Sequence, residues 1–208
     1  MYQAVLSGDI VHSSKLAAKQ YEYLLAKLSE QLAELKVRYQ SDHYFFRGDG
    51  FQVWVPNARH AWHVALLLRL QMIMLKVDAR VAIAVAPQQS HRDNLATSTG
   101  PAFTLSGQAL DTMKPQRFAC VIADTVLDPH FALNILFIDH LLQHLTPRQA
   151  EVLLSYFTSD LEGKRNLHET IAQQLGSSRV NITRLLNQAN YQLIERFLGL
   201  TEALCDAL

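Results

Sequence analysis

Two aspartates stand beside glycines where short apolar stretches end. Asp9 follows Gly8, and Asp49 lies between Gly48 and Gly50. Two carboxylates held close together repel each other unless a proton or a divalent cation lies between them. Mg²⁺ takes oxygen ligands and usually keeps phosphates or waters in its remaining positions. The pattern leaves two interpretations open: a metal site for a phosphorylated ligand, or two aspartates that only cap turns.

The elements around these aspartates alternate between strands and helices. Residues 44–47 and 51–55 are rich in aromatic and β-branched side chains, and Gly48-Asp49-Gly50 between them predicts a hairpin. Asn57 is a candidate cap for the helix that follows, and Pro101 for the first turn of another. The remaining spacing predicts strands over 2–6, 80–85 and 118–123 and helices over 16–38, 57–75 and 102–113. In this order the end of the first strand and the hairpin turn can lie side by side.

The segment after the first strand offers backbone N–H groups to a ligand. It leads into a helix, and such N–H groups can hold phosphate oxygens. We therefore predict a metal site at Asp9, Ile10 and Asp49. The predicted phosphate-binding residues are Val11, His12, Ser13 and Ser14. No side chain is assigned a catalytic role, because the sequence places no base beside either serine.

Four motifs in the first 123 residues resemble the catalytic domain of class III nucleotidyl cyclases. They are GDIVHSS, GDGFQVW, RVAIAV and GPAFTLSGQAL, in that order. In that family the two motif aspartates hold two metal ions on a nucleoside triphosphate, and they correspond to Asp9 and Asp49. The resemblance implies a ferredoxin-like α/β sandwich, an α+β fold with the strand order given above.

The same resemblance argues against efficient cyclase activity. Cyclases carry an Asn and an Arg, four residues apart, that stabilise the transition state, and these positions correspond to Thr104 and Gln108. The base-reading positions correspond to Phe45 and Thr97. Loss of a donor at a transition state typically costs several kcal/mol, or about a hundredfold in rate. We therefore expect a degenerate domain that binds a nucleotide or another phosphate ligand, with Mg²⁺ as a possible cofactor.

The C-terminal part changes character near residue 127. From there no strand is predicted, residues 129–144 read as a partly helical connector, and helices are expected over 146–157, 167–175 and 179–198. We place an α/β domain at 1–127 and an all-α domain at 128–208. The stretch LTPRQAEVLLSYF resembles the first helix of response-regulator and sigma-factor helix-turn-helix domains.

Residues 167–187 match the helix-turn-helix template. Ala172 is followed by Gly176 four residues later, by Ile182 after six more and by Leu185 after three more. Gly176 permits the left-handed conformation of the turn, and Val180 is expected to pack against the first helix with Ile182 and Leu185. The polar side chains predicted to contact DNA are Ser177, Ser178, Arg179, Asn181, Thr183, Arg184 and Asn187.

Composition limits the partners. The chain has 19 Lys and Arg residues and 19 Asp and Glu residues, so any DNA contact must come from a locally basic patch. Residues 164–187 form such a patch, because they contain four basic residues, Lys164, Arg165, Arg179 and Arg184, and one acidic residue, Glu169. The two cysteines suggest no disulfide framework, no stretch is long and apolar enough to span a membrane, and no signal peptide is recognised. We expect a cytoplasmic protein.

A narrower resemblance covers both halves. The opening YQAVLSGDIVHSSKL, the GDGFQ hairpin and the helical tail resemble the SatD family, which implies this architecture and no particular activity. The predicted function is a DNA-binding transcriptional regulator that forms a homodimer and binds double-stranded DNA. The alternative is an active nucleotidyl cyclase or transferase whose C-terminal helices bind a partner. A first domain that only dimerises is a third possibility.

Overall fold

The computed structural model describes residues 2–46, 48–87, 92, 94–123, 125–127, 129–161, 163 and 165–208. The strands are β1 (Tyr2–Ile10), β2 (Asp42–Phe46), β3 (Gly50–Val55), β4 (Ala79–Pro87) and β5 (Phe118–Ile122). The helices are α1 (Ala18–Tyr39), α2 (Ala61–Met74), α3 (Pro101–Thr112), α4 (Pro129–Gln143), α5 (Pro147–Leu161), α6 (Leu167–Gln174), α7 (Arg179–Gln188) and α8 (Tyr191–Asp206). Three short 3₁₀ turns are η1 (Ser13–Lys15), η2 (Ala58–His60) and η3 (Leu95–Thr97).

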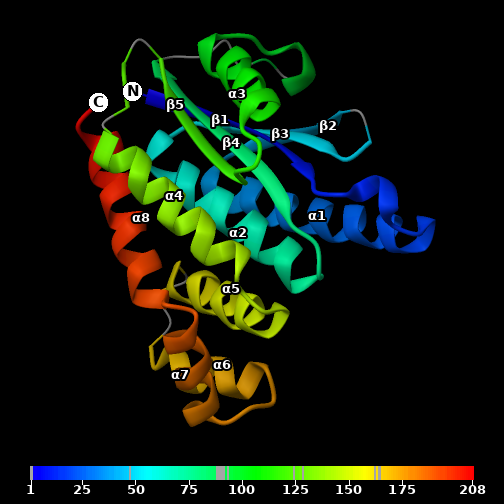
Figure 1. Ribbon diagram of the computed structural model, residues 1–208, viewed down its shortest axis with the longest axis vertical. Coiled ribbons are helices and arrows are strands. Elements are labelled where there is room, and N and C mark those ends of the chain that lie inside the picture. Colours follow the sequence, from blue (N-terminus) through cyan, green and yellow to red (C-terminus); the bar gives the residue numbers. More distant parts are fainter. Residues whose placement is uncertain are drawn as a thin grey trace.

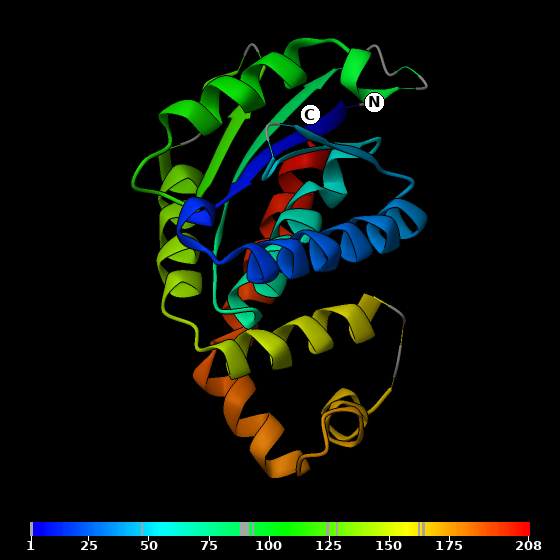
Figure 2. The same cartoon turned by 90° about the vertical axis from the view of Figure 1, so that its right-hand side faces the viewer.

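The five strands form one mixed sheet in the order β2-β3-β1-β4-β5. Neighbouring strands are antiparallel except β4 and β5, which are parallel. Helix α3 covers one face of the sheet, and α1 and α2 lie on the other (Figures 1 and 2). The predicted alternation of strands and helices over the first 123 residues is confirmed. The fold is therefore a mixed α/β layer followed by helices.

The two central strands divide their side chains between the two faces. Leu6 and Ile83 belong to the large core on the α2 side, whereas Val5 packs in a smaller cluster with Phe103 of α3. Beyond Arg80, the side chains of β4 on the α3 face are small: Ala82, Ala84 and Ala86. Because alanines leave room for a close approach, α3 packs directly against the sheet.

Helices α4 and α8 pack on the α/β layer. The Trp62 ring of α2 meets the Phe197 ring of α8 edge-on at 4.9 Å, and Phe131 of α4 stacks on Phe197 at 6.1 Å. Helices α6 and α7 lie at the end of the molecule that is farthest from the sheet (Figure 2). The main core therefore runs from β1 to α8. The predicted division at 127/128 falls at residue 128, outside the described residues, and stays a prediction.

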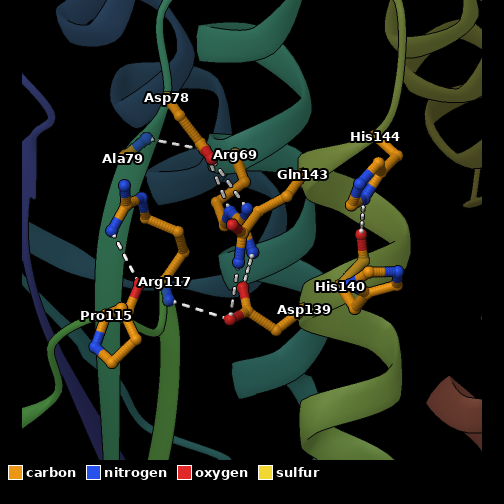
Figure 3. Close-up of polar contacts among 9 residues, drawn as sticks. All are labelled: Arg69, Asp78, Ala79, Pro115, Arg117, Asp139, His140, Gln143 and His144. Atoms are coloured by element: carbon orange, nitrogen blue, oxygen red, sulfur yellow. Dashed lines mark hydrogen bonds and ion pairs between the residues drawn. The ribbon is translucent and has the colours of Figure 1, made fainter.

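A buried cation, Arg69, links α2 to the start of β4 and to α4. The Nε and Nη2 groups of Arg69 donate to the two oxygens of Asp78 at 3.0 and 2.8 Å, and Nη1 donates to Asp139 at 2.7 Å (Figure 3). Asp139 also accepts hydrogen bonds from the Arg117 backbone N–H and from the Gln143 amide. This cluster therefore holds α4 against α2 and the start of β4.

The long helix predicted over 179–198 is wrong as a single element. It is divided into α7 and α8 at Ala189 and Asn190. Asn190 has φ 55°, a left-handed conformation that asparagine tolerates better than most residues. The change of direction lets Ile194 and Phe197 reach the core. Residues 129–144, predicted as partly helical, form the continuous helix α4 over Pro129–Gln143.

The first strand is longer than predicted. It was expected over 2–6, yet β1 continues to Ile10 and pairs with β4 along its whole length, with Asp9 opposite Arg80. Gly8 permits β1 to lie between β3 and β4 here, because a Cβ there would lie 2.4 Å from a ring carbon of Phe51 and 2.6 Å from the Arg80 carbonyl oxygen. Asp9 is therefore inside a strand and not in a loop after one. No helix in the described ranges is long and apolar enough to cross a membrane.

Candidate functional site

Asp9 is held by a cross-strand arginine that the sequence interpretation assigned no role. Arg80 Nε donates to one oxygen of Asp9 at 2.8 Å, Nη2 donates to the other oxygen, and Nη1 reaches the Leu110 carbonyl at 3.4 Å. Both side chains are partly exposed, at 17% for Arg80 and 23% for Asp9. A bidentate arginine–carboxylate pair of this kind fixes the orientation of the carboxylate and balances its negative charge.

Asp49 lies close enough to contribute to the same charge cluster. The hydrogen bond that Arg80 donates to Asp9 raises the pKa of Arg80, and the negative charges of Asp9, Asp111 and Asp49 raise it further. Burial, followed by the charge of Asp49, raises the pKa of Tyr21 on α1. The hairpin turn before Asp49 has the predicted geometry, with Gly48 at φ 82°. The end of the sheet therefore gathers several carboxylates around one guanidinium.

This cluster fits Mg²⁺ poorly. Both oxygens of Asp9 are hydrogen-bonded to Arg80, which already supplies the positive charge that two close carboxylates need. The described residues contain no group of three or more Asp, Glu, His or Cys side chains that could hold a metal ion. A divalent cation at Asp9 would compete with the guanidinium. The roles predicted for Asp9, Ile10 and Asp49 as metal ligands stay untested.

Only some residues of the predicted phosphate-binding segment, 11–14, have groups that are free to bind a ligand. The Val11 N–H donates to the Asp78 carbonyl at 2.8 Å, so this donor is already used within the fold. His12 adopts φ 59° and starts the 3₁₀ turn that contains Ser13 and Ser14. Ser13 is half-buried, whereas His12 and Ser14 are exposed. Any ligand role of these three residues stays a prediction.

The two positions that correspond to cyclase transition-state residues lie on one face of α3. Thr104 and Gln108 are one helical turn apart, and both are exposed. Neither side chain carries a charge that could stabilise a developing negative charge on a phosphate. Thr104 and Gln108 therefore offer a hydroxyl and an amide on the exposed face of α3, and no positive charge.

The second set of predicted residues lies on α7 and the turn before it. Gly176 has φ 58°, and the Ser178 side chain caps α7 by accepting the Asn181 N–H at 3.2 Å. Ile182 and Leu185 are buried against the preceding helices, as expected. Val180, expected to pack with them, is instead 79% exposed, because it follows the cap on the outer side of the helix. Lys164 of the predicted basic patch lies outside the described residues.

The exposed face of α7 carries one hydrogen-bonded row. The Asn181 amide donates to Ser177 Oγ at 2.9 Å, Arg184 donates to Asn181 Oδ1 at 2.8 Å, and Arg184 donates to Gln188 Oε1 at 2.9 Å. Arg179, Arg184 and Asn187 are exposed, and the Thr183 hydroxyl contacts His168 at 2.8 Å. Among the described residues, Arg184 has amide partners and no carboxylate partner, so its charge is not neutralised.

Sequence reasoning missed Arg80, Gln188 and the exposure of Val180. An arginine within RVAIAV was a usable signal, because a charge in an apolar strand needs a partner. The identity of that partner follows only from the register between β1 and β4. Gln188 lies four residues after Arg184, which is the helical spacing that lets two side chains meet.

No protein-family model matches this sequence, and no curated protein matches it. Several solved structures resemble it in fold. A bacterial light-regulated adenylyl cyclase has 14% identity and a TM-score of 0.46, covering 57% of this chain and 74% of its own. The guanylate cyclase domain of RhGC from Catenaria anguillulae, in complex with GTP, has 17% identity and a TM-score of 0.41, covering 53% and 72%. The catalytic core of a rhodopsin-guanylyl cyclase in complex with ATPαS has 20% identity and a TM-score of 0.40, also covering 53% and 72%.

Proposed function

We propose that this protein binds double-stranded DNA through α7 and acts as a transcriptional regulator. The observation that carries the proposal is a row of hydrogen-bonded side chains that runs from the turn before α7 along this capped helix, from half-buried Ser177 and Asn181 to exposed Arg184 and Gln188. Arginine and amide side chains are the groups that read guanine and adenine edges in the major groove. The uncompensated charge of Arg184 also suits phosphate contact.

The N-terminal end of α7 supports the same proposal. In helix-turn-helix proteins this end of the second helix approaches the base edges. Arg179 and Val180 are both exposed there. An arginine can contact guanine or phosphate, and an exposed valine can contact a thymine methyl group. Two copies of α7 in a homodimer would read two half-sites.

The α/β layer completes the proposal. It would be a ferredoxin-like, cyclase-like domain joined to a DNA-binding domain, in the arrangement implied by the SatD resemblance. Its ligand would be a nucleotide or another phosphate compound near Asp9 and Asp49. Since Arg80 already balances Asp9, we propose that Mg²⁺ is not required for the ligand to bind.

The DNA proposal is tested by selection from a pool of fragmented genomic DNA at fixed salt, followed by sequencing of the retained pieces. Wild type should enrich one or a few sites. Arg184→Ala should weaken binding to those sites roughly 5–150-fold, the effect of losing one base contact. Arg92→Ala removes the same charge from an exposed residue outside α7 and is the matched control. Equal binding by wild type and Arg184→Ala would exclude α7 as the reading helix.

The second candidate is nucleotidyl cyclisation or transfer, the class of activity named for the solved structures above. The cluster of Asp9, Arg80 and Asp49 favours it, because a guanidinium beside carboxylates can contact a triphosphate. Each nucleoside triphosphate would be incubated with Mg²⁺ or Mn²⁺, and cyclic or transferred product would be measured. Turnover that disappears in Asp9→Asn but persists in Glu30→Gln, an exposed change on α1, would replace the regulator proposal. Absence of product with all substrates would remove this candidate.

A further inference from the structure

A groove separates α4 from α8 on the face where the two helices run side by side (Figure 1). Its volume is about 610 Å³. Ile138 and Phe197 are buried at its floor, while Phe137, Leu193 and Leu200 line it and are about half exposed or more. Small-molecule sites in proteins commonly have volumes of about 300–1,000 Å³ and mostly apolar linings. The groove has both properties.

The charge in the groove has one sign. Arg196 of α8 lines it, together with His140 of α4 and His144, which directly follows α4; the two histidines lie side by side in Figure 3. Among the described residues, no aspartate or glutamate lines the groove, and Arg196 forms no ion pair. An arginine beside apolar surface, without a carboxylate partner, favours a ligand that brings a negative charge of its own.

We infer that the groove between α4 and α8 binds a small amphipathic anion, a compound with a hydrocarbon body and one carboxylate head. The body lies on Ile138 and Phe197, and the carboxylate accepts hydrogen bonds from Arg196. This site is separate from the cluster at Asp9, and the inference does not rest on the proposed DNA binding.

A small ligand suits the groove better than a second copy of the chain. A symmetric contact through this face would bring two copies of Arg196 together, with no acid in the groove lining to balance them. Like charges placed opposite each other oppose such a contact. The groove also lies beside Gln188 at the end of α7 and Asn190 at the bend before α8, so its occupant would contact the segment that orients α7.

The test uses octanoate and 1-octanol, which share an eight-carbon body and differ in the charged head. Binding is followed by NMR through the indole N–H of Trp62, whose ring contacts Phe197 below the groove. Octanoate should shift this signal and bind about tenfold more tightly than 1-octanol. Decanoate should bind up to about tenfold more tightly than octanoate, because two more CH₂ groups become buried.

Two variants locate the binding. Arg196→Gln should reduce octanoate affinity about tenfold and leave 1-octanol affinity unchanged. Arg165→Gln removes the same charge from an exposed residue outside the groove and should change neither. Equal affinity for octanoate and 1-octanol, or no effect of Arg196→Gln, would overturn the inference. A dimer found by sedimentation that dissociates in Phe137→Glu would also overturn it, by assigning the groove to a subunit interface.

Discussion

Arg69 and Arg80 both hold an aspartate through two parallel hydrogen bonds, but in very different surroundings. Arg69 is fully buried, pairs with Asp78 and also with Asp139, and lies over the Phe118 ring at 4.5 Å. Arg80 is partly exposed, and its one ion-pair partner among the described residues is Asp9. The chemical groups are the same, so the difference comes from solvent and from the number of partners.

This contrast separates a structural cluster from a candidate site. A buried charge must be fully paired, because leaving it alone in the core costs several kcal/mol. A partly exposed pair can open at a modest cost, because water replaces the lost partner. The Arg69 cluster can therefore serve only the fold, whereas Asp9 and Arg80 can exchange partners with a ligand.

The largest expected effect is on the buried cluster. Asp139→Ala leaves Arg69 with one carboxylate and removes the acceptor for the Arg117 N–H. We expect the free energy of unfolding to fall by about 3–5 kcal/mol, measured by urea denaturation. The double variant Arg69→Met with Asp139→Leu should recover much of the loss, because it leaves no unpaired charge in the core, and Asp78, which loses Arg69, is partly exposed and keeps the Ala79 N–H. A loss below about 1 kcal/mol in Asp139→Ala would mean that the cluster is not a structural requirement.

A second prediction concerns a buried polar group without a partner. The Tyr39 hydroxyl is buried and has no hydrogen-bond partner among the described residues. Burial raises its pKa from 10.0 to about 12. Above pH 10 the phenol ionises in the unfolded chain but stays protonated in the folded one. Stability contributed by this group is therefore present below pH 10 and is lost as the pH rises toward 12, by up to about 3 kcal/mol.

Comparison with Tyr39→Phe isolates this effect. The variant removes the ionisable group and should be at least as stable as wild type at pH 7, because an unpaired buried hydroxyl is unfavourable. Between pH 10 and 12 the variant should become increasingly more stable than wild type in urea denaturation. Parallel pH profiles of the two proteins would show that the hydroxyl is solvated in the folded state.

The smallest effect is expected at the exposed pair. Asp9→Asn removes the carboxylate charge but keeps an oxygen that can accept from Arg80. We expect a loss of about 1 kcal/mol or less in the free energy of unfolding, measured as for Asp139→Ala. Arg80→Gln should raise affinity for Mg²⁺, measured by calorimetry, because it frees Asp9. If Asp9→Asn lowered the free energy of unfolding as much as Asp139→Ala, both ion-pair clusters would be required for the stability of the fold.

The local features of the fold were predictable from the sequence, and the long-range pairings were not. Gly48 in the hairpin, Asn57 as a cap and Pro101 at a helix start act on neighbours a few residues away. Asp139 lies 70 residues from Arg69 in sequence, and Asp9 lies 71 residues from Arg80. Such pairs depend on strand register and helix packing, which hydrophobic periodicity does not specify.

The sequence pattern did not predict the helix break at Asn190, because this break also depends on contacts that are distant in sequence. Neither Ala189 nor Asn190 is a strong helix breaker, and the apolar spacing continues into α8. Asn190 adopts its left-handed conformation because the apolar side chains of α8 then reach the core. Packing at a distance therefore decided a local conformation, as it does where tertiary contacts override propensity.

Because helix α8 is anchored at its C-terminal end and joined to α7 at its N-terminal end, a change in its tilt would displace α7. Helix α8 has 16 residues, which gives a length of about 24 Å. Glu202 and Asp206 anchor one end to Arg59, and only two residues separate the other end from α7. A tilt of about 10° around the anchored end would displace α7 by about 4 Å. That distance is close to the spacing of about 3.4 Å between successive bases along a DNA strand, so, under the proposed function, a small rotation of α8 would be enough to move α7 by one base step.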